Sequence, residues 1–305
     1  MRVVFYGSGA FGLPTLSWLK TNHEVVQVVS QPDRPAGRGR KSTPTPITSF
    51  AREHGLDHVT VEDVADPSVV EQLSQQDATA NVVIAFGQKM PQSILEQRFA
   101  CNLHASLLPS FRGAAPINRA IMSGKKETGL SVIALAQRID AGEIYHQIAC
   151  PLDPSRTAGE IHDFLAEMGP TAIDYVLNAL DDGSLQGEAQ DEALVTHAAK
   201  LSRDDGLVRF QGDADQVRAQ IHGVTPWPGA RAKLGPRPCK IGRVEVITEN
   251  EAGRTSGQLR SDFAIQCTNG AVRPLEIQPA GSRMMPFAAF CNGAELTPGS
   301  CCTID

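Results

Sequence analysis

RVVFYGSGAFG, residues 2–12, is the stretch that decides the fold of the first half of the chain. Arg2 to Tyr6 form a β-rich apolar run, and glycines follow directly at positions 7, 9 and 12. Leucines then recur at three-residue spacing from Leu13 to Leu19, as on one face of a helix. A strand, a glycine turn and a helix in this order predict the first unit of a doubly wound α/β sheet.

Three more runs predict neighbouring buried strands, over residues 25–30, 81–86 and 100–105. The last of them carries Asn102 and His104, which point to the same side because strand side chains alternate. A Leu-Leu-Pro turn ends this strand, so both side chains lie at its carboxyl end, where open α/β sheets bind ligands. A further strand is expected over residues 130–136, and two separate helices on either side of Pro170.

The glycine turn also fits the G-x-G-x-x-G pattern of dinucleotide-binding proteins. That pattern needs an acid at the end of the second strand to hold a ribose hydroxyl, and Ser30 and Gln31 occupy that place. The missing acid argues against a nicotinamide dehydrogenase, which stays open as an alternative; the other interpretation is a close strand-to-helix turn beside a ligand pocket.

Residues 31–46 form a connection longer than usual, and long connections on compact domains are often functional. Four basic side chains lie in it against one acid, which suits contact with phosphates. These candidate nucleic-acid contacts are Arg34, Arg38, Arg40 and Lys41. The alternative is a surface excursion without a partner.

At 305 residues, with 41% hydrophobic and 20% charged residues, the chain is expected to form about two soluble globular domains. No apolar run approaches the ~20 residues of a membrane helix, and the first residues do not resemble a signal peptide, so a cytoplasmic location is expected. The seven cysteines have neither disulfide-framework nor zinc-ligand spacing. We therefore expect no metal site.

The chain turns polar from residue 181 to 205, and short strands separated by turns follow, which predicts a small β-barrel. The expected division is a domain over 1–180, a linker over 181–205 and a second domain over 206–305. Net charge is +2 from Gly206 onward (11 basic against 9 acidic residues) and −8 before it (17 against 25). A stretch without acids, between Arg218 and Arg243, suits a polyanion or simply a solvated face; its basic residues are Arg231, Lys233, Arg237 and Lys240.

Asn102, His104 and Asp140, the last in a glycine-containing turn, form a candidate catalytic group for acyl transfer to an amine. Attack of an amine on an acyl carbon creates an oxyanion, which needs hydrogen-bond donors, and an ammonium, which must lose a proton. An amide and an imidazole supply both, and a carboxylate beside the imidazole fixes its tautomer. The spacing alone also allows a structural polar pair and an Asp that bonds only its own turn.

The motifs around these residues resemble the formyltransferases that use 10-formyltetrahydrofolate. N-x-H-x-S-L-L-P (102–109), R-G-A-A-P-I (112–117) and I-D-A-G (139–142) carry the resemblance. The branch that acts on glycinamide ribonucleotide is a short single domain without R-G-A-A-P. The loop QPDRPAGRGRK (31–41), the linker QDEALVTHAAKLS (190–202) and Pro-Trp-Pro (226–228) are similar to the branch that acts on methionyl-tRNA.

The resemblance implies a Rossmann-like catalytic domain, an OB-like β-barrel and N-formylation of methionine on initiator methionyl-tRNA. It implies catalytic roles for Asn102, His104 and Asp140, and puts Arg38 in a loop that enters the acceptor-stem region. No metal is implied, and we expect a monomer. Gly7-Ser8-Gly9 departs from the family's usual Gly-Thr-Pro. The residues implied to line the folate site are Phe86, Gly87, Ser106, Leu107, Leu108, Pro109, Ile139 and Gly142.

Two further alternatives stay open. A related formyltransferase acting on a ribonucleotide or a nucleotide sugar would keep the same candidate site without needing the basic loop. A protein that only binds tRNA would release no tetrahydrofolate.

Overall fold

The computed structural model describes residues 1–36, 41–294 and 296–303, in two compact units. The first unit comprises residues 1–113, 129–150 and 162–197, and the second comprises residues 114–128, 151–161 and 198–305. Helix α5 (Pro116–Met122) thus groups with the C-terminal part of the chain, although the sequence places it in the N-terminal half. The domain limits expected from the sequence stay a prediction.

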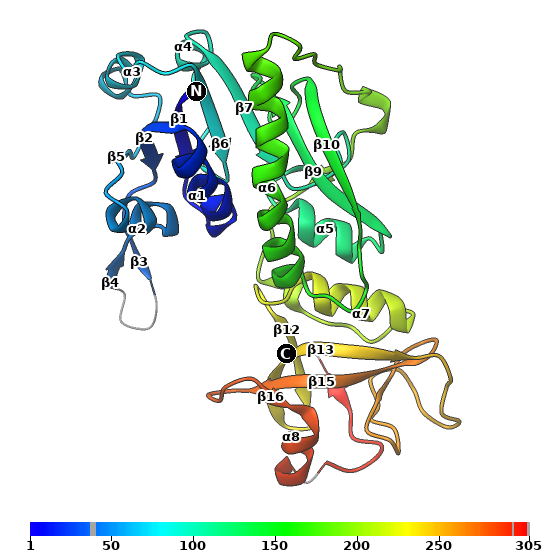
Figure 1. Cartoon of the computed structure of the whole chain (residues 1–305). Helices are drawn as coiled ribbons and strands as arrows, with labels where there is room; N and C mark the ends of the chain where they lie inside the picture. Colours follow the sequence, from blue (N-terminus) through cyan, green and yellow to red (C-terminus); the bar gives the residue numbers. More distant parts are fainter. Residues whose placement is uncertain (37–40, 295, 304–305) are drawn as a thin grey trace. The chain divides into compact units, whose positions relative to one another are not determined.

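A mostly parallel seven-stranded sheet forms the first unit, in the order β10-β9-β7-β6-β1-β2-β5 (Figure 1). Strands β5, β2, β1, β6 and β7 run parallel, and β9 runs antiparallel to β7. The doubly wound α/β prediction is confirmed. The strands are β1 (Arg2–Gly7), β2 (Glu24–Ser30), β5 (His58–Thr60), β6 (Ala80–Ile84), β7 (Phe99–His104), β9 (Glu127–Ala134) and β10 (Ile144–Pro151).

Helices cover both faces of this sheet, which is why its central strands are apolar without alternation. On one face, Val4 and Tyr6 pack with Leu73 and Ile94, which lie on α3 (Pro67–Ser74) and α4 (Gln92–Leu95). The opposite face carries α1 (Leu13–Asn22), which follows the short η1 (Ala10–Gly12), and α2 (Pro46–Glu53). Because the helices cover the two faces, the edge at the carboxyl ends of the parallel strands is formed by loops.

Helix α6 (Ala158–Asp181) corrects one expectation, because it runs without a break through Pro170. A proline inside a helix costs about 3 kcal/mol, since it removes one hydrogen bond and crowds the preceding turn. Leu165, Ile173 and Val176 are each 0% exposed on this helix. Burial of each contributes roughly 1.5–3 kcal/mol, which outweighs that cost.

The connection over residues 31–46 contains a hairpin in its described part, where only an irregular loop was expected. Strand β3 (Arg34–Ala36) pairs antiparallel with β4 (Lys41–Thr43). Arg34 lies opposite Thr43 and Lys41 lies opposite Ala36, so Arg34 and Lys41 share one face of the hairpin. Arg38 and Arg40 lie outside the described residues.

An antiparallel, nearly closed β-barrel forms the main part of the second unit, in the order β14-β15-β13-β12-β17 with β16 paired to β15. The barrel prediction is confirmed. Register shifts between Ile241 and Val244 mark bulges, which let a long strand curve. The strands are β12 (Ala230–Leu234), β13 (Arg237–Ile247), β14 (Ile265–Gln266), β15 (Ala271–Pro279), β16 (Met285–Pro286) and β17 (Cys302–Thr303).

Two helices of this unit were not expected from the sequence. Helix α7 (Ala214–Gly223) begins with a capping box formed by Asp213 and Gln216, and its apolar side chains join the barrel core. Helix α8 (Phe287–Ala294) packs beside β15. Residues 257–259 contribute only isolated bridges, at Gln258 and Leu259. None of the helices in the described part of the chain is long and apolar enough to cross a membrane.

Candidate active site

The glycine turn after β1 is closed by its own hydrogen bonds. The backbone N–H groups of Ser8 and Gly9 both donate to the carbonyl of Ala85, over 3.2 and 3.3 Å. A Cβ at position 7 would lie 2.6 Å from the ring of Phe5, so close packing requires a glycine there. Both amides are therefore already bonded within the protein, and the turn does not support the dinucleotide alternative.

Ser8, in the segment Gly7-Ser8-Gly9 that departs from the usual Gly-Thr-Pro, ties three loops together. Its hydroxyl donates to the carbonyl of Phe86 (3.1 Å) and accepts from the backbone N–H of Gln31 (3.1 Å). The side-chain amide of Gln31 donates to the same carbonyl of Phe86 (2.8 Å). The serine therefore fixes the ends of β1, β2 and β6 relative to one another.

His104 and Asp140 lie side by side in the first unit. His104 Nδ1 is 3.5 Å from Asp140 Oδ2, and the side chains are 7% and 12% exposed. The second ring nitrogen, Nε2, lies 3.0 Å from the carbonyl oxygen of Phe111. The carboxylate also accepts a hydrogen bond from the backbone N–H of Gly113 (2.9 Å). Residues 36 positions apart in the sequence thus form one buried acid–imidazole pair.

Asn102 lies two residues before His104 on β7 and on the same face of that strand. In the pairing with β9, Asn102 is opposite Ile133 and His104 is opposite Ser131. The side chain of Asn102 is partly buried, and it makes no hydrogen bond to any described residue. Its amide group is therefore available to a ligand at the carboxyl end of β7.

Asp140 occupies the loop between β9 and β10, in a backbone conformation that few residues adopt. Its φ is 53°, in the left-handed region, where Asp is tolerated better than most residues other than Gly. Nearby, a Cβ at Gly142 would lie 1.9 Å from the carbonyl oxygen of Ala134. In the Asp-Ala-Gly sequence, Asp140 thus adopts the left-handed conformation, and Gly142 allows the backbone to pass close to the carbonyl of Ala134.

Gln190 and Arg112 also contact this loop, although the sequence suggested no individual role for either. Gln190 Nε2 donates to the carbonyls of Asp140 and Gly142, and Arg112 Nε donates to Gln190 Oε1. Arg112 is 4% exposed. Their only signal in the sequence was their place in two matching motifs.

The Ser-Leu-Leu-Pro turn is held by β9 and β10. Ser131 Oγ donates to the carbonyl of Ser106 (2.7 Å) and accepts from the N–H of Leu108 (3.0 Å). Gln147 Nε2 donates to the carbonyl of Leu108 (2.9 Å). Ser106 and Leu108 are buried, whereas Leu107 and Pro109 are partly exposed. Of the four predicted folate contacts, the latter two offer accessible side chains.

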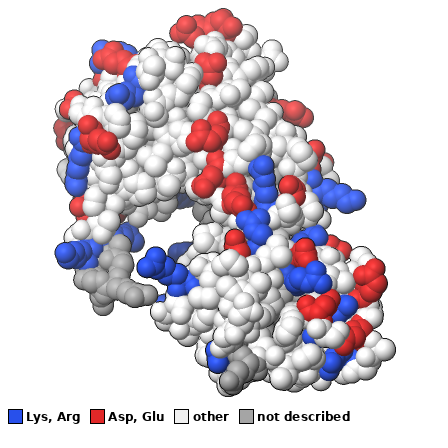
Figure 2. Space-filling view, turned by 60° about the horizontal axis from the view of Figure 1, so that its bottom comes forward, with Lys and Arg blue, Asp and Glu red and all other residues white. Residues whose placement is uncertain are grey.

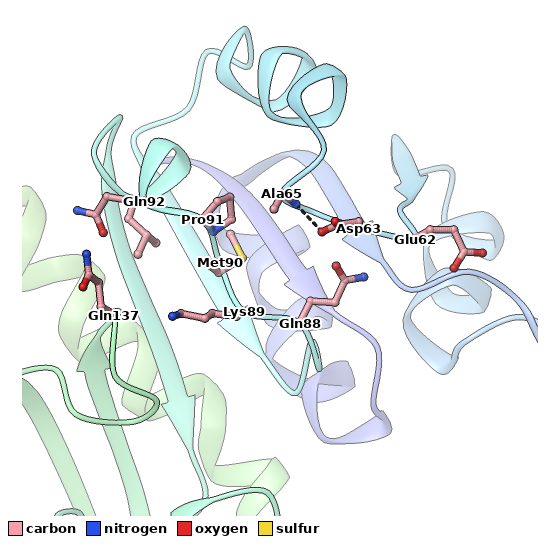
Figure 3. Close-up of a pocket in the computed structure, with 10 residues that line it drawn as sticks. Glu62, Asp63, Ala65, Gln88, Lys89, Met90, Pro91, Gln92 and Gln137 are labelled. Atoms are coloured by element: carbon pink, nitrogen blue, oxygen red, sulfur yellow. Dashed lines mark hydrogen bonds between the residues drawn. The ribbon is translucent and has the colours of Figure 1, made fainter.

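The other predicted folate residues differ in exposure. Phe86 is 2% exposed and packs edge-on against Tyr6, and its carbonyl already accepts from Ser8 and Gln31, so neither its ring nor its carbonyl is open to a ligand in this structure. Gly87 lies against Gln31, and Ile139 is 69% exposed. The residues that directly follow Gly87 in the chain line a cavity of about 570 Å³ (Figure 3). Its lining residues are Glu62, Asp63, Ala65, Gln88, Lys89, Met90, Pro91, Gln92, Leu95 and Gln137.

Three of the four predicted basic residues of the second unit share the outer face of the barrel. Arg231 lies opposite Lys240, and Lys233 lies two residues further along β12. Arg237 lies at the hairpin end of β13. Arg231 and Lys240 donate to the carbonyls of Arg203 and Pro228, and no carboxylate of the described residues lies within ion-pair distance of either.

Other cations of this unit are balanced by acids. Arg273 contacts both Glu245 (2.6 Å) and Asp262 (2.9 Å), and Arg260 contacts Glu251 (3.7 Å). The mixture of basic and acidic side chains is visible on the surface in Figure 2. Within the described ranges, no group of His, Cys, Asp and Glu is placed to hold a metal ion.

Comparison with known proteins places this geometry in a family. Residues 1–177 match the formyl transferase family model, and residues 200–295 match the model of the formyl transferase C-terminal domain. The methionyl-tRNA formyltransferase of Geobacter sulfurreducens is 38% identical over 304 residues, which cover 98% of this chain and 96% of the relative.

Solved structures share the fold at lower identity. HypX from Aquifex aeolicus, in complex with tetrahydrofolic acid, is 17% identical with a TM-score of 0.65, over 97% of this chain and 48% of that one. WlaRD, a sugar 3N-formyl transferase, is 16% identical with a TM-score of 0.67, over 93% and 99%. The full-length match, both family models and the shared motifs lead to one conclusion: the chain belongs to the methionyl-tRNA formyltransferase family.

Proposed function

We propose that this chain transfers the formyl group of 10-formyltetrahydrofolate to the amino group of methionine on initiator methionyl-tRNA. The observation that carries the proposal is the buried pair of His104 and Asp140, 3.5 Å apart, with Asn102 on the same strand face. The family match over nearly the whole chain supplies the substrates.

In the proposed reaction the methionine amine attacks the formyl carbon directly. A C–N bond forms to the amine, the bond from carbon to N10 of the folate breaks, and N10 takes a proton. The side-chain amide of Asn102 donates to the oxyanion, since it has no other partner within the described chain. His104, with Asp140 3.5 Å away, takes the proton that the ammonium loses, and the pair returns a proton to N10 of the folate.

The cavity beside Gln88 is the proposed binding site of the folate ring system. Its volume, about 570 Å³, lies within the usual range of small-molecule pockets. Lys89 and Gln137 offer polar groups along its wall (Figure 3), whereas the side-chain amide of Gln88 is bonded to the backbone of Val61 and Val64. Glu62 and Asp63 also line it, so it suits the uncharged ring rather than the carboxylates of the folate tail.

The proposed tRNA contacts are two basic surfaces, one in each unit. One is the hairpin face with Arg34 and Lys41, and the other is the barrel face with Arg231, Lys233 and Lys240. Cations on phosphates give binding that weakens with salt. Arg38→Ala is expected to weaken productive tRNA binding much more than folate binding; equal losses for both substrates would contradict this role.

A formylation assay tests the proposal. The protein is incubated with charged initiator methionyl-tRNA and 10-formyltetrahydrofolate, and both formyl-methionine and tetrahydrofolate are measured. Equal amounts of the two products are expected. Parallel reactions contain a ribonucleotide amine or an amino sugar nucleotide instead of the tRNA. Formylation of these small amines but not of methionyl-tRNA would replace the proposal with the small-acceptor alternative.

A further inference from the structure

Gln190 bridges the two ends of the catalytic loop segment that carries Asp140. Its Nε2 donates to the carbonyl of Asp140 (2.8 Å) and to the carbonyl of Gly142 (2.7 Å). These two carbonyls flank Ala141, so a single side-chain amide binds both sides of the turn. The contact reaches across 50 residues of sequence, from the segment that follows α6.

Arg112 determines which way the Gln190 amide points. Its Nε donates to Gln190 Oε1 (2.9 Å), and its Nη2 donates to Glu192 Oε1 (3.0 Å). A guanidinium has only donors, so it must face the oxygen of the amide and leave the NH₂ group for the loop. The side chain of Arg112 is only 3% exposed, which keeps water from replacing it.

Phe111 and Gly113, on either side of Arg112, each contact one member of the catalytic pair. The carbonyl oxygen of Phe111 lies 3.0 Å from His104 Nε2, and the backbone N–H of Gly113 donates to Asp140 Oδ2. Arg112, between them, holds Gln190. The segment 111–113 thus aligns the imidazole directly, the carboxylate directly, and the backbone of the carboxylate's loop through Gln190.

Asp140 needs such support. A residue other than Gly in the left-handed region costs on the order of 1–2 kcal/mol, and it stays there only when its surroundings hold it. With φ at 53°, Asp140 is expected to relax to another backbone conformation if its carbonyl loses its partner. The carboxylate would then swing away from His104 Nδ1.

We propose that Gln190 is a positioning residue for formyl transfer: through the carbonyls of Asp140 and Gly142 it holds the Asp140 carboxylate against His104. The inference rests on the proposed function, since it assigns Asp140 a part in catalysis. Gln190 touches no substrate in this role. Its loss should slow the chemical step and leave substrate binding unchanged.

Gln190→Glu isolates this contact. A glutamate still accepts from Arg112 and gains an ion pair with it, but it cannot donate to the two carbonyls and repels them. We expect kcat to fall about tenfold, as for loss of about 1.4 kcal/mol of transition-state stabilisation, while KM for both substrates changes less than about twofold. Gln186→Glu is the matched control, because Gln186 is exposed and has no side-chain hydrogen bond to the described residues.

A double-mutant cycle with Asp140→Asn separates positioning from general structural support. If Gln190 acts through the carboxylate, Gln190→Glu should change kcat less than about twofold once Asp140 is Asn. Gln190→Met, which removes the amide without adding charge, is carried through the same cycle, and every kcat refers to the folded fraction. Full tenfold losses in both backgrounds would overturn the positioning role.

The cycle also tells this inference apart from the proposed function. If Asp140→Asn alone keeps the wild-type rate, the catalytic role of Asp140 fails and the inference falls with it. If Asp140→Asn is slow but both Gln190 variants match Gln186→Glu, the catalytic pair stands and only the role of Gln190 is refuted.

Discussion

Each unit contains a buried histidine, His104 in the first and His222 in the second, and their hydrogen-bond partners differ. His222, 1% exposed, lies with Nδ1 3.0 Å from the carbonyl of Pro154, and its Nε2 accepts from the backbone N–H of Val244 (3.1 Å). His104, 6% exposed, meets a carbonyl on one side and the carboxylate of Asp140 on the other. Burial is therefore common to both, and the carboxylate distinguishes them.

The difference separates a packing role from a chemical one. Nε2 of His222 accepts a hydrogen bond from a backbone N–H, so that nitrogen carries no proton and the imidazole is neutral. The ring thus connects the backbone N–H of Val244 with the carbonyl of Pro154. His104 has a partner that can share or take a proton, and it lies at the carboxyl end of a parallel strand. A histidine of this kind can take part in proton transfer, which is the role proposed for it.

Removing the charge of Asp140 should have the largest effect among the changes that compare the two histidines. Asn is nearly the same size, tolerates the left-handed backbone and can still accept from Gly113, so Asp140→Asn should fold normally. We expect kcat to fall by about 10²–10³-fold, within the range of general acid–base contributions. Steady-state formylation measures this, with thermal unfolding as the check on the fold.

His222→Gln is the matched change in the other unit, where the opposite pattern is expected. The free energy of unfolding should decrease, since two buried backbone groups lose their shared partner, while kcat per folded molecule stays near the wild-type value. A loss of kcat comparable to that of Asp140→Asn would erase the distinction between the two histidines.

The pH dependence of stability should identify His222 as well. Burial lowers the pKa of His222 from 6.5 to about 4. The unfolded state thus binds a proton between pH 6.5 and 4 while the folded state does not, so this contribution is complete above pH 6.5 and is lost as pH falls toward 4. Between pH 7 and 4 the loss should be roughly 3 kcal/mol in the wild type.

Urea unfolding at several pH values provides the measurement, with His222→Gln as the reference protein. The decrease in this window should be smaller in the variant, because glutamine does not titrate. Identical pH profiles for the two proteins would show that His222 is protonated as easily in the folded state as in the unfolded one.

The same distinction between partners applies to cations on the barrel, with a smaller expected effect. Lys240 donates to a carbonyl, whereas Arg273 lies between two acids. Lys240→Gln should weaken tRNA binding a few-fold and lower the slope of log affinity against log salt by about 1. Arg273→Gln, the control, should leave the slope unchanged; equal changes in both would argue against the basic barrel face.

The sequence predicted the parts of this molecule that follow from periodicity and motif. Uninterrupted apolar runs gave the parallel strands, and alternation on β7 put Asn102 and His104 on one face. The approach of Asp140 to His104 was expected from the family motifs and is present at 3.5 Å. Local pattern and resemblance together were enough for the acid–imidazole pair.

What the sequence did not reveal depends on contacts between distant segments. Gln190 reads as one polar residue in a polar linker, and only the buried Arg112 gives its amide a fixed direction. Pro170 predicted a helix end, but burial of apolar side chains on both sides of it outweighed the local cost. Helix α7 was not expected because its few apolar residues pack against the barrel strands, a contact that the sequence of the helix alone does not show.

The most direct test of the account is single-turnover formylation of methionyl-tRNA by Asn102→Ala and His104→Ala at saturating 10-formyltetrahydrofolate. This experiment observes the transfer step itself, free of product release. We expect rate constants lower by about 10²–10³-fold with folding intact, as for loss of an oxyanion donor or a proton acceptor. Near wild-type rate constants in either variant would contradict the assignment of that residue to catalysis.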